Sequence, residues 1–259
     1  MSTQVINGLS VEITGQGSAV LCIHGLGGSS NVWSPLLPAL EGRQVIRFDL
    51  PGSGRSALGK SPLSIDVFVE AVEVVLNNLD VEKVDILAHS MGTIVAAHFA
   101  AKHPEKVASL ALFGPLLAPP DAGRDGIRAR AKHAAEGVHA IQEIADAIVQ
   151  GATSRETKLE QPAVTAFVRE FIMRQTPEGY SQSCAALAEA QPADVTKLNM
   201  PVLLVTGDQD GVAPPANVKA YGERLENAHV VVFEGCGHWT PLEKPQDCIK
   251  ELNNFYAVM

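Results

Sequence analysis

Apolar runs of five residues recur along this chain, and each is flanked by Gly, Pro, Asp or Asn residues. Runs of this length and composition are typical of strands that are buried on both faces of a sheet. They predict strands over Ala19–Ile23, Gln44–Phe48, Val84–Ala88, Ser109–Phe113, Val202–Thr206 and His229–Phe233. The segment Gln4–Ile13 predicts a further antiparallel hairpin, because its central Asn7-Gly8 pair suits a two-residue turn.

Helical periodicity separates the predicted strands, most clearly over Ile65–Leu79, where apolar residues recur every three or four positions. Strands that alternate with helices predict a mostly parallel sheet with helices on both faces. The alternation stops between Phe113 and Val202, where only helical stripes occur. A structureless loop of that length is unusual. We therefore predict a helical cap over residues 116–198, inserted into a core formed by residues 1–115 and 199–259. Its stripes are Ile141, Ile144, Ile148 and Val149; Val164, Phe167, Val168, Phe171 and Ile172; and Tyr180, Cys184 and Leu187.

Composition narrows the class of protein. The 259 residues are 46% hydrophobic and 19% charged, which suits one large domain with an insertion that folds without disulfides. The net charge of −9 and the lack of a Lys/Arg run argue against nucleic acid or an anionic membrane as partner. No membrane span or signal peptide is expected. The four scattered Cys residues indicate reduced thiols, so we expect a cytoplasmic protein.

The segment Val84–Ala97 carries the first chemical signal. An apolar strand runs directly into Ser90, which is followed by an Ala-rich helix. A serine at a sharp strand-to-helix turn is typical of a nucleophile elbow, which requires small residues two positions on either side. Ala88 and Gly92 meet that requirement, although Ala88 stands where Gly is usual. The alternative is that Ser90 only caps the helix.

A glycine-rich turn, His24–Gly28, follows the strand that ends at Ile23. Such a turn frees backbone N–H groups that can stabilise a developing oxyanion. A phosphate loop is the competing interpretation, but the turn lacks both the G-x-G-x-x-G spacing and a Walker lysine. His24 itself is expected to be a structural, hydrogen-bonding residue.

Two further loops follow the last two predicted strands. The first contains Asp208 and Asp210, either of which could orient an imidazole, and the second places His238 between Gly237 and Trp239. The order Ser, Asp, His along the chain is the order found on this kind of sheet. All of these residues lie just beyond the carboxyl ends of strands, where open α/β sheets build their sites.

These motifs together resemble the α/β-hydrolase superfamily along the whole chain. The matching segments are His24–Gly28, Asp49–Ser56, Ala88–Gly92, Gly207–Asp210 and Gly237-His238. The resemblance implies an α/β-hydrolase fold with a mostly parallel, eight-stranded sheet, flanking helices and a helical cap after the sixth strand. Within the superfamily, the chain is most similar to small ester and lactone hydrolases such as 3-oxoadipate enol-lactonase-like proteins.

The resemblance also implies roles for individual residues. Ser90 is the expected nucleophile, His238 the general base and acid, and Asp210, in preference to Asp208, the orienting carboxylate. The backbone N–H groups of Leu26 and Met91 would form the oxyanion hole. No metal and no organic cofactor are expected, and the partner is a small-molecule ester or lactone.

Other residues have two interpretations each. Four residues are candidates for the substrate pocket: Gly25, His89, Trp33 and Trp239. His89 and both Trp residues could equally pack in the core. Cys236 could be a thiol nucleophile, but its position is wrong for this fold. A basic cluster at the start of the cap could bind a substrate carboxylate or could be a solvated helix face; it contains Arg124, Arg128, Arg130 and Lys132.

Several functions remain open on the sequence. A serine hydrolase of esters or lactones is favoured. A carbon–carbon bond hydrolase of ring-cleavage products is an alternative, although Gly28-Ser29 and Gly92-Thr93 depart from the usual P-G and G-G of those relatives. A cofactor-free peroxidase activity could accompany the same residues. A ligand sensor that does not turn over is the alternative from another class. Haloalkane dehalogenation is excluded because it requires Asp in place of Ser90.

Overall fold

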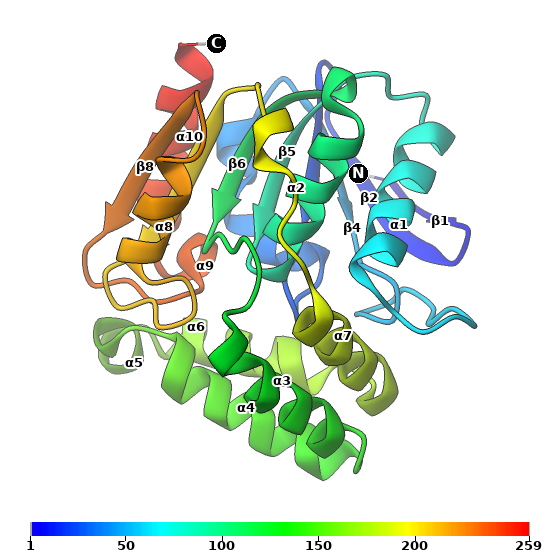
Figure 1. Ribbon diagram of the computed structural model, residues 1–259, viewed down its shortest axis with the longest axis vertical. Helices are drawn as coiled ribbons and strands as arrows, with labels where there is room; N and C mark the ends of the chain where they lie inside the picture. Colours follow the sequence, from blue (N-terminus) through cyan, green and yellow to red (C-terminus); the bar gives the residue numbers. More distant parts are fainter. Residues whose placement is uncertain (1, 259) are drawn as a thin grey trace.

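Eight strands form one sheet in the order β1-β2-β4-β3-β5-β6-β7-β8 (Figure 1). This is the architecture in a computed structural model, which describes residues 2–258. The β2 strand pairs antiparallel with β1 and β4, and all other neighbours are parallel. The predicted α/β fold is confirmed. The bounds are β1 Ser2–Ile6, β2 Leu9–Thr14, β3 Ala19–Ile23, β4 Gln44–Phe48, β5 Val84–His89, β6 Val107–Phe113, β7 Val202–Gly207 and β8 Ala228–Phe233.

The hairpin turn and the strand limits follow from local sequence. Asn7 and Gly8 both have positive φ, 48° and 83°, as a two-residue hairpin turn of the predicted kind requires. Each predicted strand begins and ends within two residues of an observed one. The agreement has a simple cause, because β3, β5 and β7 are buried along their whole length and their apolar runs are therefore uninterrupted.

Helices cover both faces of the sheet. One buried cluster joins the sheet to α1 (Ile65–Asn78), α2 (Met91–Lys102) and α8 (Pro215–Gly222). A second cluster joins its other face to the 3₁₀ segment η1 (Ser30–Leu40), α9 (Thr240–Glu243) and α10 (Pro245–Ala257). Short 3₁₀ turns occur at η2 (Pro104–Lys106) and η3 (Val195–Lys197). Ser64 caps α1 by accepting a hydrogen bond from the Val67 N–H, 3.2 Å away.

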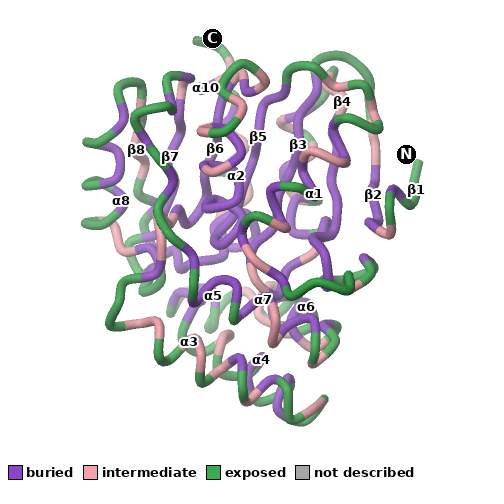
Figure 2. The backbone as a smooth tube through the Cα atoms, turned by 45° about the vertical axis from the view of Figure 1, so that its right-hand side comes forward, coloured by how far each residue is buried: buried purple, intermediate pink, exposed green. Residues whose placement is uncertain are grey.

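Five helices lie between β6 and β7 and gather at one end of the sheet (Figure 1). We call them the cap helices. Their outer faces are exposed, whereas the central strands are buried throughout (Figure 2). The apolar stripes identified in the sequence lie on α4, α6 and α7, whereas α3 buries only Ala131 and Ala134 and has no such stripe. The bounds are α3 Asp121–Ala134, α4 Val138–Ala152, α5 Arg155–Glu160, α6 Pro162–Met173 and α7 Pro177–Glu189.

The order of the strands creates a crevice at the carboxyl end of the sheet. The β3 strand lies between β4 and β5, so the connections that leave β3 and β5 run in opposite directions. Ligand sites of open α/β sheets form at such a switch point. Here it brings the turn after β3, Gly25–Gly28, next to Ser90 at the end of β5.

Candidate active site

Ser90 occupies a strained turn between β5 and α2. Its φ of 53° and ψ of −124° lie in a region that costs a non-glycine residue about 1–3 kcal/mol. Its hydroxyl does not cap α2, which rejects the capping interpretation. The turn also demands close approach, because a Cβ on Gly92 would lie 2.6 Å from the carbonyl oxygens of Ile23 and His24. A Cβ on Gly25 would lie 2.7 Å from the Cβ of Ser90.

Three side chains meet at this turn in a continuous hydrogen-bonded chain. The Oγ of Ser90 lies 2.7 Å from Nε2 of His238, and Nδ1 of His238 lies 2.8 Å from Oδ2 of Asp210. The residues come from three separate connections, after β5, β7 and β8. Ser90 is 8% exposed, and His238 and Asp210 are 5% and 3% exposed. This arrangement can move a proton from the serine hydroxyl to the imidazole and stabilise the imidazolium that results.

Asp210, and not Asp208, contacts the histidine. Burial by itself would raise the pKa of the Asp210 carboxyl, but His238 and the backbone N–H groups of Val212 and Ala213 lower that pKa to about 2. Asp210 is therefore ionised at neutral pH and accepts from Nδ1–H of His238. Asp208 is exposed and accepts a hydrogen bond from the Cys236 N–H, 3.1 Å away.

Two backbone N–H groups beside Ser90 remain free to bind a ligand. Within residues 2–258, neither Leu26 N–H nor Met91 N–H donates to a protein acceptor. His24 holds the turn in shape: its Nδ1 lies 2.8 Å from the Gly25 carbonyl oxygen, and its Nε2 accepts from the Leu50 N–H at 2.9 Å. His24 is thus a buried structural residue, and the free N–H groups lie where an oxyanion could be stabilised.

The expected pocket residues, Gly25 included, are buried. His89 is 1% exposed and its Nε2–H donates to the His238 carbonyl oxygen at 2.9 Å. Its ring lies 5.0 Å from the His238 ring and 5.1 Å from the Trp239 ring. Trp33 has no exposed surface and packs edge-on against Phe113, so it belongs to the core in place of the expected pocket wall. His89 therefore packs against the rings of His238 and Trp239, whereas Trp33 packs in the core.

The geometry does not support Cys236 as a nucleophile. Burial raises the pKa of the Cys236 thiol, and Glu243 raises it further, so the group stays protonated. Within residues 2–258, no cluster of His, Cys, Asp and Glu could hold a metal ion. None of the helices in that range is both long and apolar enough to cross a membrane.

The family description "alpha/beta hydrolase fold" matches residues 18–245. The chain belongs to this family. The match includes the turn after β3 and all three hydrogen-bonded side chains, and it confirms the resemblance seen in the motifs.

Proteins that are similar to this α/β hydrolase are named as an esterase, a hydrolase and an acetyltransferase component. A pimeloyl-[acyl-carrier protein] methyl ester esterase of Aeromonas hydrophila is 29% identical over 95% of this chain and 98% of its own. A 2-hydroxymuconate semialdehyde hydrolase of a Pseudomonas strain is 27% identical over 94% of this chain and 88% of its own. The acetyltransferase component of the Pseudomonas putida acetoin cleaving system is 30% identical over 94% of this chain. The hydrolase spans only 65% of that relative's length.

Solved structures share the whole fold. A thermophilic esterase from Thermogutta terrifontis superimposes with a TM-score of 0.91 at 24% identity, covering 99% of this chain and 98% of its own. The enol-lactonase of Burkholderia xenovorans gives 0.88 at 21% identity, covering 99% of this chain and all of its own. At these identities the likeness shows the fold of the hydrolase and nothing finer.

Glu243 clamps the loop that carries His238, and no pattern in the sequence pointed to it. Its carboxylate is 2% exposed and accepts from the N–H groups of Gly237 and Trp239, both at 3.0 Å. It also accepts at 2.8 Å from the Ser154 N–H and the Thr157 hydroxyl. Glu243 therefore fixes both neighbours of the histidine in the hydrolase and ties them to the start of α5.

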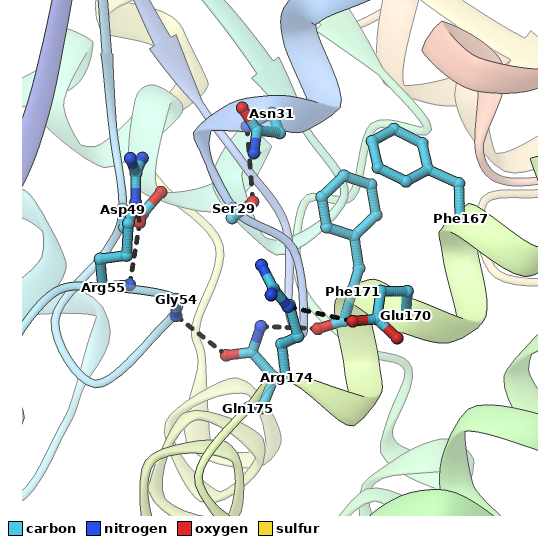
Figure 3. A pocket seen from close by; sticks show the side chains of 10 residues that line it. All are labelled: Ser29, Asn31, Asp49, Gly54, Arg55, Phe167, Glu170, Phe171, Arg174 and Gln175. Carbon is cyan, nitrogen blue, oxygen red and sulfur yellow. Dashed lines mark hydrogen bonds and ion pairs between the residues drawn. The ribbon is translucent and has the colours of Figure 1, made fainter.

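Gln175 is a second residue that the sequence did not reveal. Its Nε2 donates to the carbonyl oxygens of Gly27 and Gly28, both at 3.1 Å, and to that of Phe171 at 2.8 Å. Its Oε1 accepts from the Gly54 N–H at 3.3 Å (Figure 3). Gln175 thus joins the end of α6 to the turn that carries Leu26 N–H, so the cap and the turn after β3 form one hydrogen-bonded unit.

A cavity of about 470 Å³ lies against this junction between α6 and the core. Phe167 and Phe171 of α6 line one side of it (Figure 3). Asp49 and Arg55 line the opposite side, where their ion pair of 3.0 Å is extended by Glu12. The charged groups on this side of the cavity are paired with one another. They therefore stabilise the turn after β4.

Proposed function

We propose that this protein hydrolyses carboxylic ester or lactone bonds of a small molecule through an acyl-enzyme. The observation that carries the proposal is the chain Ser90–His238–Asp210 at a strained elbow, with the free N–H groups of Leu26 and Met91 beside it. The esterase names among the relatives support the same class of reaction. Residues 116–198 act as a cap that closes over the site.

The proposed reaction has two similar halves. His238 takes the proton of Ser90 as its oxygen attacks the carbonyl carbon, and Leu26 N–H and Met91 N–H stabilise the oxyanion. The bond to the leaving oxygen breaks, and His238 gives its proton to that oxygen. A water molecule then attacks the acyl-enzyme by the same route, releasing the acid and restoring Ser90. Asp210 stays ionised throughout and holds His238 in the required tautomer.

The test is hydrolysis of a chain-length series of 4-nitrophenyl esters and a set of lactones by the wild type and by Ser90→Ala. The expected result is turnover that falls by about 10⁴-fold or more in the variant, because the nucleophile is lost while binding remains. Circular dichroism of Ser90→Ala serves as the folding control. Equal hydrolysis by the two folded proteins would reject the proposal.

Carbon–carbon bond hydrolysis is the second candidate, because a relative of similar length is named a 2-hydroxymuconate semialdehyde hydrolase. Both reactions use the same three side chains, so the substrate separates them. A ring-cleavage semialdehyde cleaved by the wild type much faster than any ester or lactone would favour the second candidate over the first.

A further inference from the structure

The peptide between Ser90 and Met91 carries one of the two N–H groups that the proposed reaction assigns to the oxyanion hole. The carbonyl and the N–H of a trans peptide point to opposite sides of the chain, so the direction of the Ser90 carbonyl sets the direction of the Met91 N–H. The strained backbone of Ser90, with φ 53° and ψ −124°, persists only where its surroundings hold it. A group that binds the Ser90 carbonyl oxygen therefore also aims the Met91 N–H.

Thr93, in the first turn of α2, binds the Ser90 carbonyl oxygen through two groups. Its backbone N–H donates to that oxygen at 2.8 Å, and its side-chain Oγ1 lies 2.6 Å from the same oxygen. Thr93 has no exposed surface, so bulk water does not compete for either contact. Two donors can occupy both lone pairs of a carbonyl oxygen, which restricts the tilt of its peptide plane more than one donor does.

The Leu116 N–H determines where the Thr93 hydroxyl sends its proton. Leu116 lies in the connection after β6, and its N–H donates to Oγ1 of Thr93 at 2.9 Å. An N–H group only donates, so the hydroxyl accepts this bond and keeps its one proton for another acceptor. That acceptor is the Ser90 carbonyl oxygen at 2.6 Å, because the Leu116 carbonyl oxygen is more distant, at 3.4 Å. The orientation of the hydroxyl is therefore fixed.

The same hydroxyl joins the elbow to the segment that packs against His238. Gly114 starts this segment, and a Cβ on Gly114 would lie 2.8 Å from Cε1 and 2.9 Å from Nδ1 of the imidazole. The Ser90 N–H donates to the Phe113 carbonyl oxygen at 2.9 Å. Ser90 is thus held to the end of β6 by its own N–H, and to the residues that follow β6 by its carbonyl oxygen through Thr93.

We propose that Thr93 is a positioning residue for the oxyanion hole, because its hydroxyl holds the Ser90–Met91 peptide with the Met91 N–H aimed at the developing oxyanion. Thr93 acts through that peptide and not by contact with the ester. Without the hydroxyl, the strain at Ser90 can relax by a rotation of the peptide. Oxyanion donors act mainly in the transition state, so the loss should appear in kcat and not in KM. The inference rests on the proposed ester hydrolysis at Ser90.

The experiment separates the hydroxyl of Thr93 from its bulk. Thr93→Val keeps the β-branched shape without the hydroxyl, and Thr93→Ser keeps the hydroxyl. Thr165→Val is the matched control, because the Thr165 hydroxyl also donates to a carbonyl oxygen three positions earlier, that of Pro162 in α6, at 2.9 Å. Complete loss of an oxyanion donor costs about 10²- to 10³-fold in kcat, so a tilted donor should cost Thr93→Val about 10- to 100-fold, with KM changed less than about twofold. Thr93→Ser should stay within about threefold of the wild type, and Thr165→Val within about twofold.

A second substrate tests whether the loss lies in the oxyanion hole. A thionoester places sulfur, a weak hydrogen-bond acceptor, where the ester has its carbonyl oxygen. A tilted Met91 N–H should therefore slow the ester more than the thionoester, and lower the ratio of their kcat/KM values by about fivefold or more in Thr93→Val. The thionoester is assayed with enzyme in excess, so that slow cleavage is measured. A displaced Ser90 or His238 would instead slow both substrates equally.

Three outcomes would overturn the role of Thr93: a Thr93→Val enzyme as active as the wild type, a Thr93→Ser enzyme as slow as Thr93→Val, or equal losses on ester and thionoester. If Thr93→Val does not fold, Thr93→Ala and Thr93→Ser give the same comparison, because both lack the methyl group and differ by the hydroxyl. In each of these outcomes, ester hydrolysis that is lost in Ser90→Ala leaves the proposed function standing. Ester hydrolysis that persists in Ser90→Ala would overturn both.

Discussion

Replacing Glu243 by Ala removes one carboxylate from four buried donors, which are three backbone N–H groups and the Thr157 hydroxyl. No Lys, Arg or His within residues 2–258 pairs with this carboxylate, so oriented dipoles alone hold its charge. Each donor left unsatisfied costs about 1–3 kcal/mol, and water that enters the space recovers part of the total. We expect Glu243→Ala to lose about 3–5 kcal/mol of unfolding free energy, a large part of the stability of a typical domain.

Glu243→Gln should lose less unfolding free energy than Glu243→Ala, because the amide can keep part of these contacts. One carboxylate oxygen serves Ser154, Thr157 and Gly237, and the other serves only the Trp239 N–H. The amide oxygen can take the first position, which leaves its NH₂ group facing the Trp239 N–H. We therefore expect a loss of about 1–3 kcal/mol for Gln, intermediate between the wild type and Ala.

The same variants test whether the clamp positions His238. Gly237 and Trp239 flank the histidine, so freeing them lets the imidazole move away from Ser90. We expect kcat of ester hydrolysis to fall in the order wild type, Gln, Ala, with little change in KM. Urea unfolding followed by tryptophan fluorescence gives the stabilities, and the exposed Asp247→Ala is the control. Stabilities within about 0.5 kcal/mol of the wild type for both Glu243 variants would refute the reasoning.

Two further predictions use the same assays. Asp210→Asn should lower kcat by about 10³- to 10⁴-fold because His238 loses its orienting charge, whereas Asp208→Asn should change it less than about twofold; a larger loss for Asp208→Asn would reassign the acid. His89 provides a pH test, because burial and the nearby His238 lower the pKa of His89 from 6.5 to about 3. Between these values the unfolded chain binds a proton that the folded protein does not, so His89 costs about 1.4 kcal/mol of stability per unit fall in pH. His89→Gln keeps an N–H for the His238 carbonyl and should lose about 2 kcal/mol less than the wild type between pH 7 and pH 5, and parallel stability curves would contradict this assignment.

The sequence by itself determined the sheet and the points where chemistry could occur. Strand burial and helix periodicity are local properties, so the runs ending at Ile23 and Phe48 marked β3 and β4 to the residue. The turn at Ser90 was also predictable from the sequence, because a nucleophile elbow needs small residues at fixed spacing. The hydrophobic pattern did not indicate the α3 helix, because this helix buries few apolar side chains and therefore has little apolar periodicity.

Only the tertiary structure decided which polar groups meet. The carboxylates of Asp208 and Asp210 are two positions apart, yet the loop geometry gives one to the Cys236 N–H and the other to His238. Glu243 looks like a surface residue in the sequence. Besides the nearby Gly237 and Trp239, its carboxylate binds the N–H of Ser154, which lies more than 50 positions away. A hydrogen-bond partner depends on such distant contacts, and local pattern does not encode them.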